Sequence, residues 1–212
     1  MKTRYFIMIA FIALLVSCAS NEQKAEKLIK TDLEENMYDF ESYDPIKTTV
    51  SEAKQVMYND TACRNRALRL YAAIQLSANY LIQSEEAKEH MEIWTPSHYA
   101  TAYHRSQYVK YREQYLDNKE KAKQVYNVAV RIGKQLQGMV AALDTSKVMG
   151  WSVSHRFRCK NRTGESMICN VRYLVDSGFS NVVFSADEDD DNEKNIVEML
   201  NFAVSNEFEY KE

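Results

Sequence analysis

The acidic segment between Asp187 and Glu198 has residue types and spacing that suit a calcium-binding loop. Read from Asp187, the first, third and fifth positions of the loop template hold carboxylates, and Glu198 occupies the twelfth. Hard oxygen ligands suit a hard cation, so the segment gives one hypothesis, a structural calcium ion. Its ligands would be Asp187, Asp189, Asp191, Glu193, Asn195 and Glu198.

The same segment also fits a simpler interpretation. Asn192 stands where the template has glycine, although Asn tolerates the left-handed backbone conformation better than most residues. A strand is expected in front of the loop, where calcium loops of this type have a helix. Acidic residues favour helix N-termini, and Asp190 with Glu193 would form a capping pair. The segment therefore predicts either a calcium loop or the solvated start of a helix.

Cys159 and Cys169 lie on two alternating apolar and polar segments joined by the turn-like residues 161–165. If the turn centres on Gly164, the two cysteines face each other across a β-hairpin. A disulfide there would stabilise the fold by roughly 2–3 kcal/mol in the chain-entropy model. The alternative is two unpaired thiols, separated by a shift in register. The sequence has no Cys-x-x-Cys motif, so thiol redox catalysis is not predicted, and Cys63 is expected to be a small buried residue.

Cys18 follows a short basic head and an unbroken apolar run from Tyr5 to Val16. This run is too short to cross a bilayer but suits the apolar region of a secretory signal. Its end, Leu15-Val16-Ser17-Cys18, resembles a bacterial lipobox, in which the cleaved chain begins with a cysteine that carries diacylglycerol and a further acyl chain such as palmitate. We expect a signal peptide over residues 1–17, lipid attachment at Cys18 and a tether over 18–26. The alternative is an ordinary signal peptide with an incidental cysteine.

Lipid attachment would place the protein in the cell envelope, held by two or three acyl chains. Ala19 gives no inner-membrane retention signal of the Asp type, so the outer membrane is expected. Only Glu22 supplies acidity near the anchor, which favours the periplasmic side over the cell surface. Without Lys2 and Arg4 the formal charge moves from −3 to −5. No basic stripe is visible in the sequence, so nucleic acid is not an expected partner.

The sequence contains no nucleophile elbow, phosphate-binding loop or paired-carboxylate motif, so it predicts neither a catalytic residue nor an enzyme. An envelope hydrolase would need His155, Arg158 and Asp176 to share a cleft, whereas His155 alone is more simply a packed core residue. Tyrosines are frequent between residues 99 and 115 and could offer flat faces to a glycan, although packing between helices is their simpler role.

The elements that position these residues begin with long helices, because the chain has only 5 glycines and 2 prolines. Apolar residues recur at helical spacing from Ala25 to Met37, and residues 60–92 lack helix breakers. Ser97 is a candidate N-cap for the next helix. That helix has two rows of residues spaced seven apart. The first row is Tyr108, Tyr115, Ala122, Ala129, Leu136 and Leu143, and the second is Tyr111, Asn118, Val125, Ile132 and Met139.

These rows predict an antiparallel helical hairpin over residues 60–145, because the nearest partner for the seam is the preceding helix. A short strand is expected over 46–53. Beyond Val148 the apolar residues alternate, which predicts further strands up to about residue 186 and then a closing helix over 192–207. The predicted fold class is α+β: a long antiparallel helical hairpin, a small antiparallel sheet of three to four strands and a C-terminal helix, in one domain spanning 27–212.

Two segments resemble small lipoproteins of the Bacteroidota that have no assigned activity. Residues 38–45 contain a Ser-Tyr-x-Pro element, and residues 155–164 are similar to a strand with the pattern His-Lys-Tyr-Arg-x-Lys-Asn-x-x-Gly. The matching positions are Ser42, Tyr43, Pro45, Arg158, Lys160, Asn161, Gly164 and Asp176. The likeness covers about 27–58 and 148–186, and this chain departs from it at Cys159 and at Arg162-Thr163. It implies location and fold more than function.

Together these observations predict a lipid-anchored binding or accessory subunit at the outer membrane, with a protein partner in the envelope. A glycan ligand is possible but has no specific support. Such a module would leave an apolar or tyrosine-rich patch open on the helical hairpin. The two alternatives are a calcium-stabilised ligand-binding domain and an envelope hydrolase.

Overall fold

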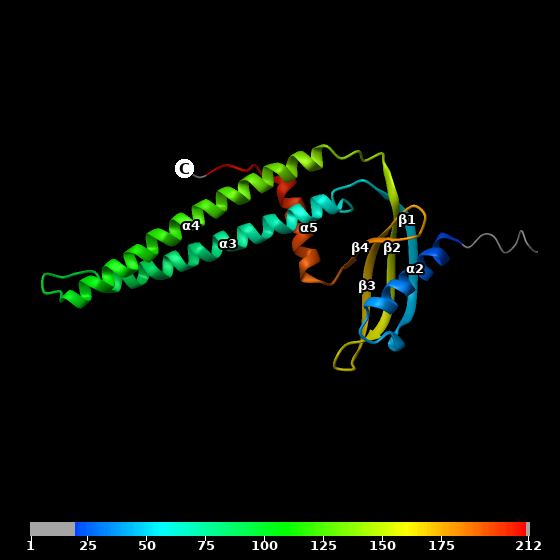
Figure 1. Cartoon of the computed structure of the whole chain (residues 1–212), viewed down its shortest axis with the longest axis horizontal. Helices are drawn as coiled ribbons and strands as arrows, with labels where there is room; N and C mark the ends of the chain where they lie inside the picture. Colours follow the sequence, from blue (N-terminus) through cyan, green and yellow to red (C-terminus); the bar gives the residue numbers. More distant parts are fainter. Residues whose placement is uncertain (1–19, 211–212) are drawn as a thin grey trace, which may run out of the picture. The chain divides into compact units, whose positions relative to one another are not determined.

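The computed structural model describes residues 20–210, so the predicted signal peptide and Cys18 lie outside the described residues. The elements are, in order, α2 (Asn21–Asn36), the 3-10 turn η1 (Phe40–Ser42), β1 (Asp44–Lys54), α3 (Thr61–Ile93), α4 (Ala102–Ala141), β2 (Val148–Lys160), β3 (Ser166–Val175), β4 (Val182–Asp187) and α5 (Asp191–Ser205). The predicted α+β class is confirmed, with the long helical pair, the antiparallel sheet and the C-terminal helix all present (Figure 1).

The chain forms two compact units, where the sequence suggested one domain. The sheet unit comprises residues 20–55 and 144–194, and the hairpin unit comprises residues 56–143 and 195–210. Helix α5 contributes its first turn to the sheet unit and its remaining residues to the hairpin unit.

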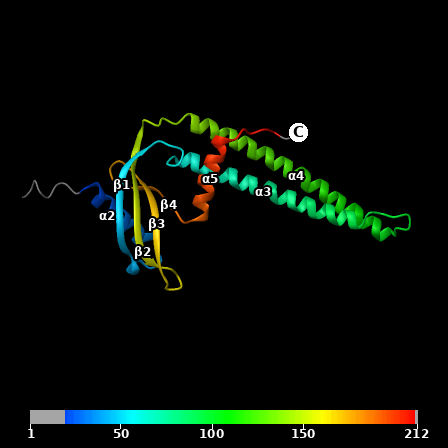
Figure 2. The same cartoon turned by 180° about the vertical axis from the view of Figure 1, so that it is seen from behind.

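The sheet unit is a four-stranded antiparallel sheet in the order β1-β2-β3-β4, with α2 against one face (Figures 1 and 2). Alternate residues of β2, Val153, His155, Phe157 and Cys159, point into the core with Ala25, Ile29 and Leu33 of α2. The opposite residues of β2 are exposed from Ser154 to Lys160. This period-two burial is what the alternating sequence predicted.

Helix α2 begins at Asn21, within the segment 18–26 that was expected to be a tether. Ser20 and Gln23 form a capping box, in which the Gln23 N–H donates to Ser20 Oγ at 3.3 Å and the Ser20 N–H donates to Gln23 Oε1 at 3.0 Å. Ala25 is fully buried. The tether prediction therefore assigned too many residues to the linker, because the capping pair satisfies N–H groups at the start of the helix.

The hairpin unit consists of α3 and α4, which lie side by side in antiparallel orientation (Figure 1). Helix α3 begins at an N-cap in which Asp60 accepts from the Cys63 N–H at 2.9 Å. The N-cap of α4 is Thr101, which accepts from the His104 N–H at 3.3 Å, so the prediction of Ser97 is wrong by four residues. At the base of the hairpin, Leu70 and Leu136 pack with Leu200 and Ala203 of α5.

Candidate functional site: an open groove on the helical hairpin

Small residues line much of the seam between α3 and α4. Ser77 Oγ donates to the carbonyl oxygen of Ala122 at 2.9 Å, and Ser84 Oγ donates to that of Tyr115 at 3.4 Å. Ala122 and Ala129 are buried on the α4 side, as the seven-residue rows predicted. Larger residues beside this seam, Leu81 and Leu116, are about half exposed.

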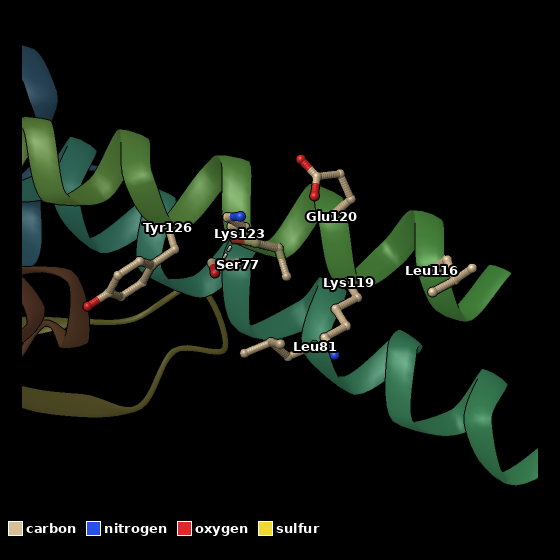
Figure 3. Close-up of a pocket in the computed structure, with 8 residues that line it drawn as sticks. Ser77, Leu81, Leu116, Lys119, Glu120, Lys123 and Tyr126 are labelled. Carbon is tan, nitrogen blue, oxygen red and sulfur yellow. Dashed lines mark hydrogen bonds between the residues drawn. The ribbon is translucent and has the colours of Figure 1, made fainter. Parts of the chain in front are cut away.

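Beside this seam lies a groove of about 500 Å³ (Figure 3). Ser77 and Ala122 line it at the seam, and Tyr126 borders it on α4. Leu81 of α3 and Leu116 of α4 are exposed to 49% and 47%. Leu81 lies seven residues after Ile74 and therefore on the same side of α3. It is half exposed because its side of the hairpin meets only one partner helix.

Two of the three charged residues that line the groove are cationic. Lys119 and Lys123 line it, and Lys119 Nζ lies 3.3 Å from the hydroxyl oxygen of Tyr115. Glu120 also borders the groove, but its carboxylate accepts from Gln124 Nε2 at 3.0 Å, and Figure 3 shows it turned away from Leu81. The rim thus presents two ammonium groups beside two exposed leucines.

Nearer the base of the hairpin, the same side of α4 is covered by the chain itself. Gly133, one heptad after Tyr126, lies so close to the ring of Phe208 that a Cβ there would overlap it. Gln137 Nε2 donates to the carbonyl oxygens of Ala203 at 2.9 Å and of Asn206 at 2.8 Å. The C-terminal residues therefore act as a third element on this row of α4, and the groove lies one heptad beyond them, beside Lys123 and Tyr126.

Further large apolar side chains are exposed along both helices. They include Leu68, Leu76, Ile82 and Ile93 of α3 and Tyr103, Val109 and Val128 of α4. Scattered exposed apolar residues are ordinary on protein surfaces, whereas at the groove two leucines, a tyrosine and a concave shape coincide.

The acidic segment is held by local contacts. Asp187 Oδ1 accepts from the Asp189 N–H at 3.0 Å, and Asp190 Oδ1 accepts from the Asn192 N–H at 2.8 Å. Glu193 is buried and pairs with Arg172 at 3.2 Å. Asp190 thus caps the start of α5 through its carboxylate, as the expected capping pair required of it.

The predicted calcium ligands are not gathered into one site. Asp191 lies 3.3 Å from Lys194 Nζ, and Asn195 and Glu198 follow on α5, where Glu198 is exposed. Across residues 20–210, no group of three or more His, Cys, Asp or Glu side chains could hold a metal ion. The calcium site therefore stays a prediction without geometric support.

The two hairpin cysteines are near each other but not directly opposite. Cys159 faces Met167, and Cys169 faces Phe157, so the predicted register is wrong by two residues. The cause is the turn. Asn161 Oδ1 accepts from the Thr163 and Glu165 N–H groups at 3.0 and 2.9 Å, which centres the loop one residue earlier than expected.

Both cysteines are buried free thiols with their sulfur atoms 3.5 Å apart, as diagonal neighbours on the same face of the sheet. Burial, together with the neighbouring Cys159 sulfur, raises the pKa of Cys169 to about 12. The raised pKa disfavours the thiolate at neutral pH, and the thiolate is the form that exchanges.

A fully buried histidine lies at the centre of the sheet core. His155 Nε2 is 2.9 Å from the Tyr43 hydroxyl oxygen, and its Nδ1 is 2.9 Å from Thr48 Oγ1. Burial lowers the pKa of His155 below its ordinary value, while Glu26 opposes that shift weakly. A neutral imidazole has one donor and one acceptor nitrogen, and the two hydroxyls satisfy both. The expected role of His155 as a packed residue fits this geometry.

The three residues of the hydrolase alternative do not converge. His155 points into the core, whereas Arg158 lies on the opposite, exposed face of β2 and pairs with Asp44 at 3.1 Å. Asp176 follows β3 and accepts from the Ser180 N–H at 2.6 Å within a turn. A cleft that holds all three is absent from this arrangement of the sheet unit.

No protein-family model, curated protein or solved structure matches the chain. Within residues 20–210, no helix combines the length and apolar character needed to cross a membrane. The role of the groove is therefore inferred from its geometry alone. Sequence reasoning anticipated an open apolar patch on the hairpin but not its place, and the serines at positions 77 and 84 of the seam were the available signal.

Proposed function

We propose that the protein is a lipid-anchored binding or accessory subunit of the bacterial envelope, which docks a partner protein in the groove on its helical hairpin. The observation that carries this proposal is the open groove beside the seam, with half-exposed Leu81 and Leu116 facing solvent next to a row of α4 that the chain covers elsewhere. Binding of a helix in a groove is a common form of peptide recognition, in which apolar side chains on one face of the helix enter the groove.

The occupant we propose is an amphipathic helix of the partner. Helix α5 supplies the precedent, since Leu200 and Ala203 already pack against α3 and α4 at the base of the hairpin. The ammonium groups of Lys119 and Lys123 favour acidic residues beside the apolar anchors of such a helix. A third helix would complete a bundle that a two-helix hairpin leaves open.

A matched pair of positions tests the groove. A photo-crosslinking residue at Leu81 is expected to trap the partner in intact cells, whereas the same residue at Leu76 is not, although Leu76 is exposed to 46% on the same helix and does not line the groove. Mass spectrometry of the crosslink should identify an amphipathic helical segment. The synthetic segment should bind the purified protein, with affinity reduced at least about tenfold by Leu81→Asp and unchanged by Leu76→Asp.

Equal crosslinking from both positions, or a crosslinked segment without apolar anchors, would remove the groove as the docking site. Circular dichroism of both Asp variants controls for folding, since each replaces a half-exposed leucine.

The anchor has its own test. Labelled palmitate should be incorporated into the full-length chain and not into Cys18→Ser, and fractionation should recover the native protein with the outer membrane. A mature protein that retains Met1, or that carries an unmodified Cys18, would contradict lipid attachment without affecting the groove.

A further inference from the structure

The sheet unit exposes a row of cations that the sequence alone did not indicate. On β2, the residues that point away from α2 are Ser154, Arg156, Arg158 and Lys160, all exposed. In the sequence they alternate with apolar residues, so they form no basic run. On the folded sheet they share one face, in a chain whose formal net charge is −3.

Strand pairing brings further positive charge to this face. Lys47 of β1 lies directly opposite Arg156 of β2. Like charges in directly opposed cross-strand positions destabilise a sheet. Arg158 is partly neutralised by Asp44, whereas the side chains of Lys47, Arg156 and Lys160 form no ion pair within residues 20–210.

The other half of the same face is different. On β3, Arg172 is mostly buried and paired with Glu193, and Asn170 Nδ2 contacts Asp189 Oδ2 at 3.4 Å. Uncompensated charge is therefore confined to β1 and β2. Unfavourable pairing of like charges at one place in an otherwise regular sheet points to a function at that place.

We propose that this cationic face, defined by Lys47, Arg156, Arg158 and Lys160, binds an extended acidic segment of a partner protein. Alternate residues of a strand are about 6.8 Å apart, so Arg156, Arg158 and Lys160 repeat at that interval along β2. An extended peptide with acidic residues at alternate positions has the same repeat. Charge complementarity of this kind sets register and partner choice.

Two other occupants fit less well. For a lipid surface, helix α2, the described element nearest in sequence to the predicted anchor at Cys18, lies on the opposite face of the sheet from these cations. A glycan would be expected to stack on aromatic rings, and the exposed residues of β1 and β2 on this face carry none.

The test uses two labelled peptides of equal composition, one with glutamate and serine alternating and one with all glutamates contiguous, titrated by fluorescence anisotropy. The alternating peptide should bind more tightly, and raised salt should weaken it. Arg156→Glu and Lys47→Glu should each weaken binding at least about tenfold. Arg69→Glu and Arg131→Glu make the same charge change at exposed positions on the hairpin and should leave binding unchanged.

Four results would overturn the proposal. The first is equal affinity for the two peptides, and the second is an equal loss of affinity in the hairpin control variants. The third is binding of anionic vesicles or acidic polysaccharide in preference to the peptide. The fourth is self-association that Arg156→Glu abolishes, because the acidic segment would then come from a second copy of this chain. The outcome is separable from the groove, because Leu81→Asp should leave peptide binding to the sheet intact.

Discussion

The Tyr43 hydroxyl oxygen and His155 Nε2 lie 2.9 Å apart, and this contact joins residues 38–45 to residues 155–164. Beside them, the Lys160 N–H donates to Ser42 Oγ at 2.9 Å. Residues far apart in the sequence thus fasten the start of β1 to the end of β2. These contacts give both segments a structural role in holding β1 against β2.

Removing the Tyr43 hydroxyl should destabilise the fold. In Tyr43→Phe, one nitrogen of the buried His155 loses its partner, and an unsatisfied buried polar atom costs about 1–3 kcal/mol. Urea denaturation would measure the change in free energy of unfolding. Tyr38→Phe is the control, since Tyr38 is 75% exposed and should change that free energy by less than about 0.5 kcal/mol. Equal effects of the two substitutions would contradict the role of the hydrogen bond.

Acidification should also destabilise the fold through His155. Its pKa is lowered by burial, so the unfolded chain binds this proton at a higher pH than the folded chain does. Stability is therefore full above the ordinary histidine pKa of 6.5 and falls as the pH drops from there towards the folded pKa. Urea denaturation across this range should show the decline, and His155→Gln should flatten it. An unchanged slope in that variant would assign the effect to other groups.

Oxidation should join Cys159 and Cys169. Their sulfur atoms are 3.5 Å apart, and a bridge closing this short loop would stabilise the fold by roughly 2–3 kcal/mol, less any strain. Intact mass should fall by the mass of two hydrogens after oxidation, and reductant should then lower the free energy of unfolding. Cys63→Ala should keep both responses, because Cys63 lies in the hairpin unit. A mass that does not change would leave the pair as packed thiols.

Gly150 should not tolerate a side chain. Its φ is +152°, and a Cβ there would overlap the carbonyl oxygen of Val175. Gly150→Ala should cost at least about 1–3 kcal/mol from backbone strain alone, before the clash is added. Gly138→Ala is the matched control, because its Cβ meets nothing and alanine favours a helix by about 1 kcal/mol. Thermal unfolding should shift in opposite directions for the two variants.

Calcium should leave the stability unchanged, because the acidic segment uses its groups locally and Glu193 already pairs with Arg172. Thermal unfolding in millimolar calcium and in chelator measures this directly. A melting temperature that rises with calcium and is insensitive to it in Asp189→Asn would restore the loop hypothesis, since a ligand that binds only the folded state must stabilise it.

Periodicity was enough to predict the elements. Seven-residue rows gave the hairpin, and alternation gave the strands, because both patterns follow directly from which face is buried. The register of β2 and β3 was not accessible in this way. It depends on how Asn161 folds the turn, and a shift of two residues keeps every side chain on the same face, so burial could not reveal it.

The candidate sites were predicted less well. Leu81 has helical spacing from Ile74, but its exposure depends on where it lies relative to α4, a relationship between two segments that one helical pattern does not contain. The cationic face was not predicted for the same reason, since Lys47 and Arg156 become neighbours only when β1 pairs with β2.

The pairing of β1 with β2 also has a consequence for how the chain folds. These adjacent antiparallel strands are joined not by a turn but by the whole of α3 and α4, and the last rung between them is the hydrogen bond from the Gln55 N–H to the Lys147 carbonyl oxygen at 2.9 Å. A disordered connection of that length would slow strand pairing, because closing a long loop costs chain entropy. Helices form through contacts between residues close in the sequence, so α3 and α4 can form first and bring the ends of the two strands together. We therefore expect the helical hairpin to close before the sheet forms.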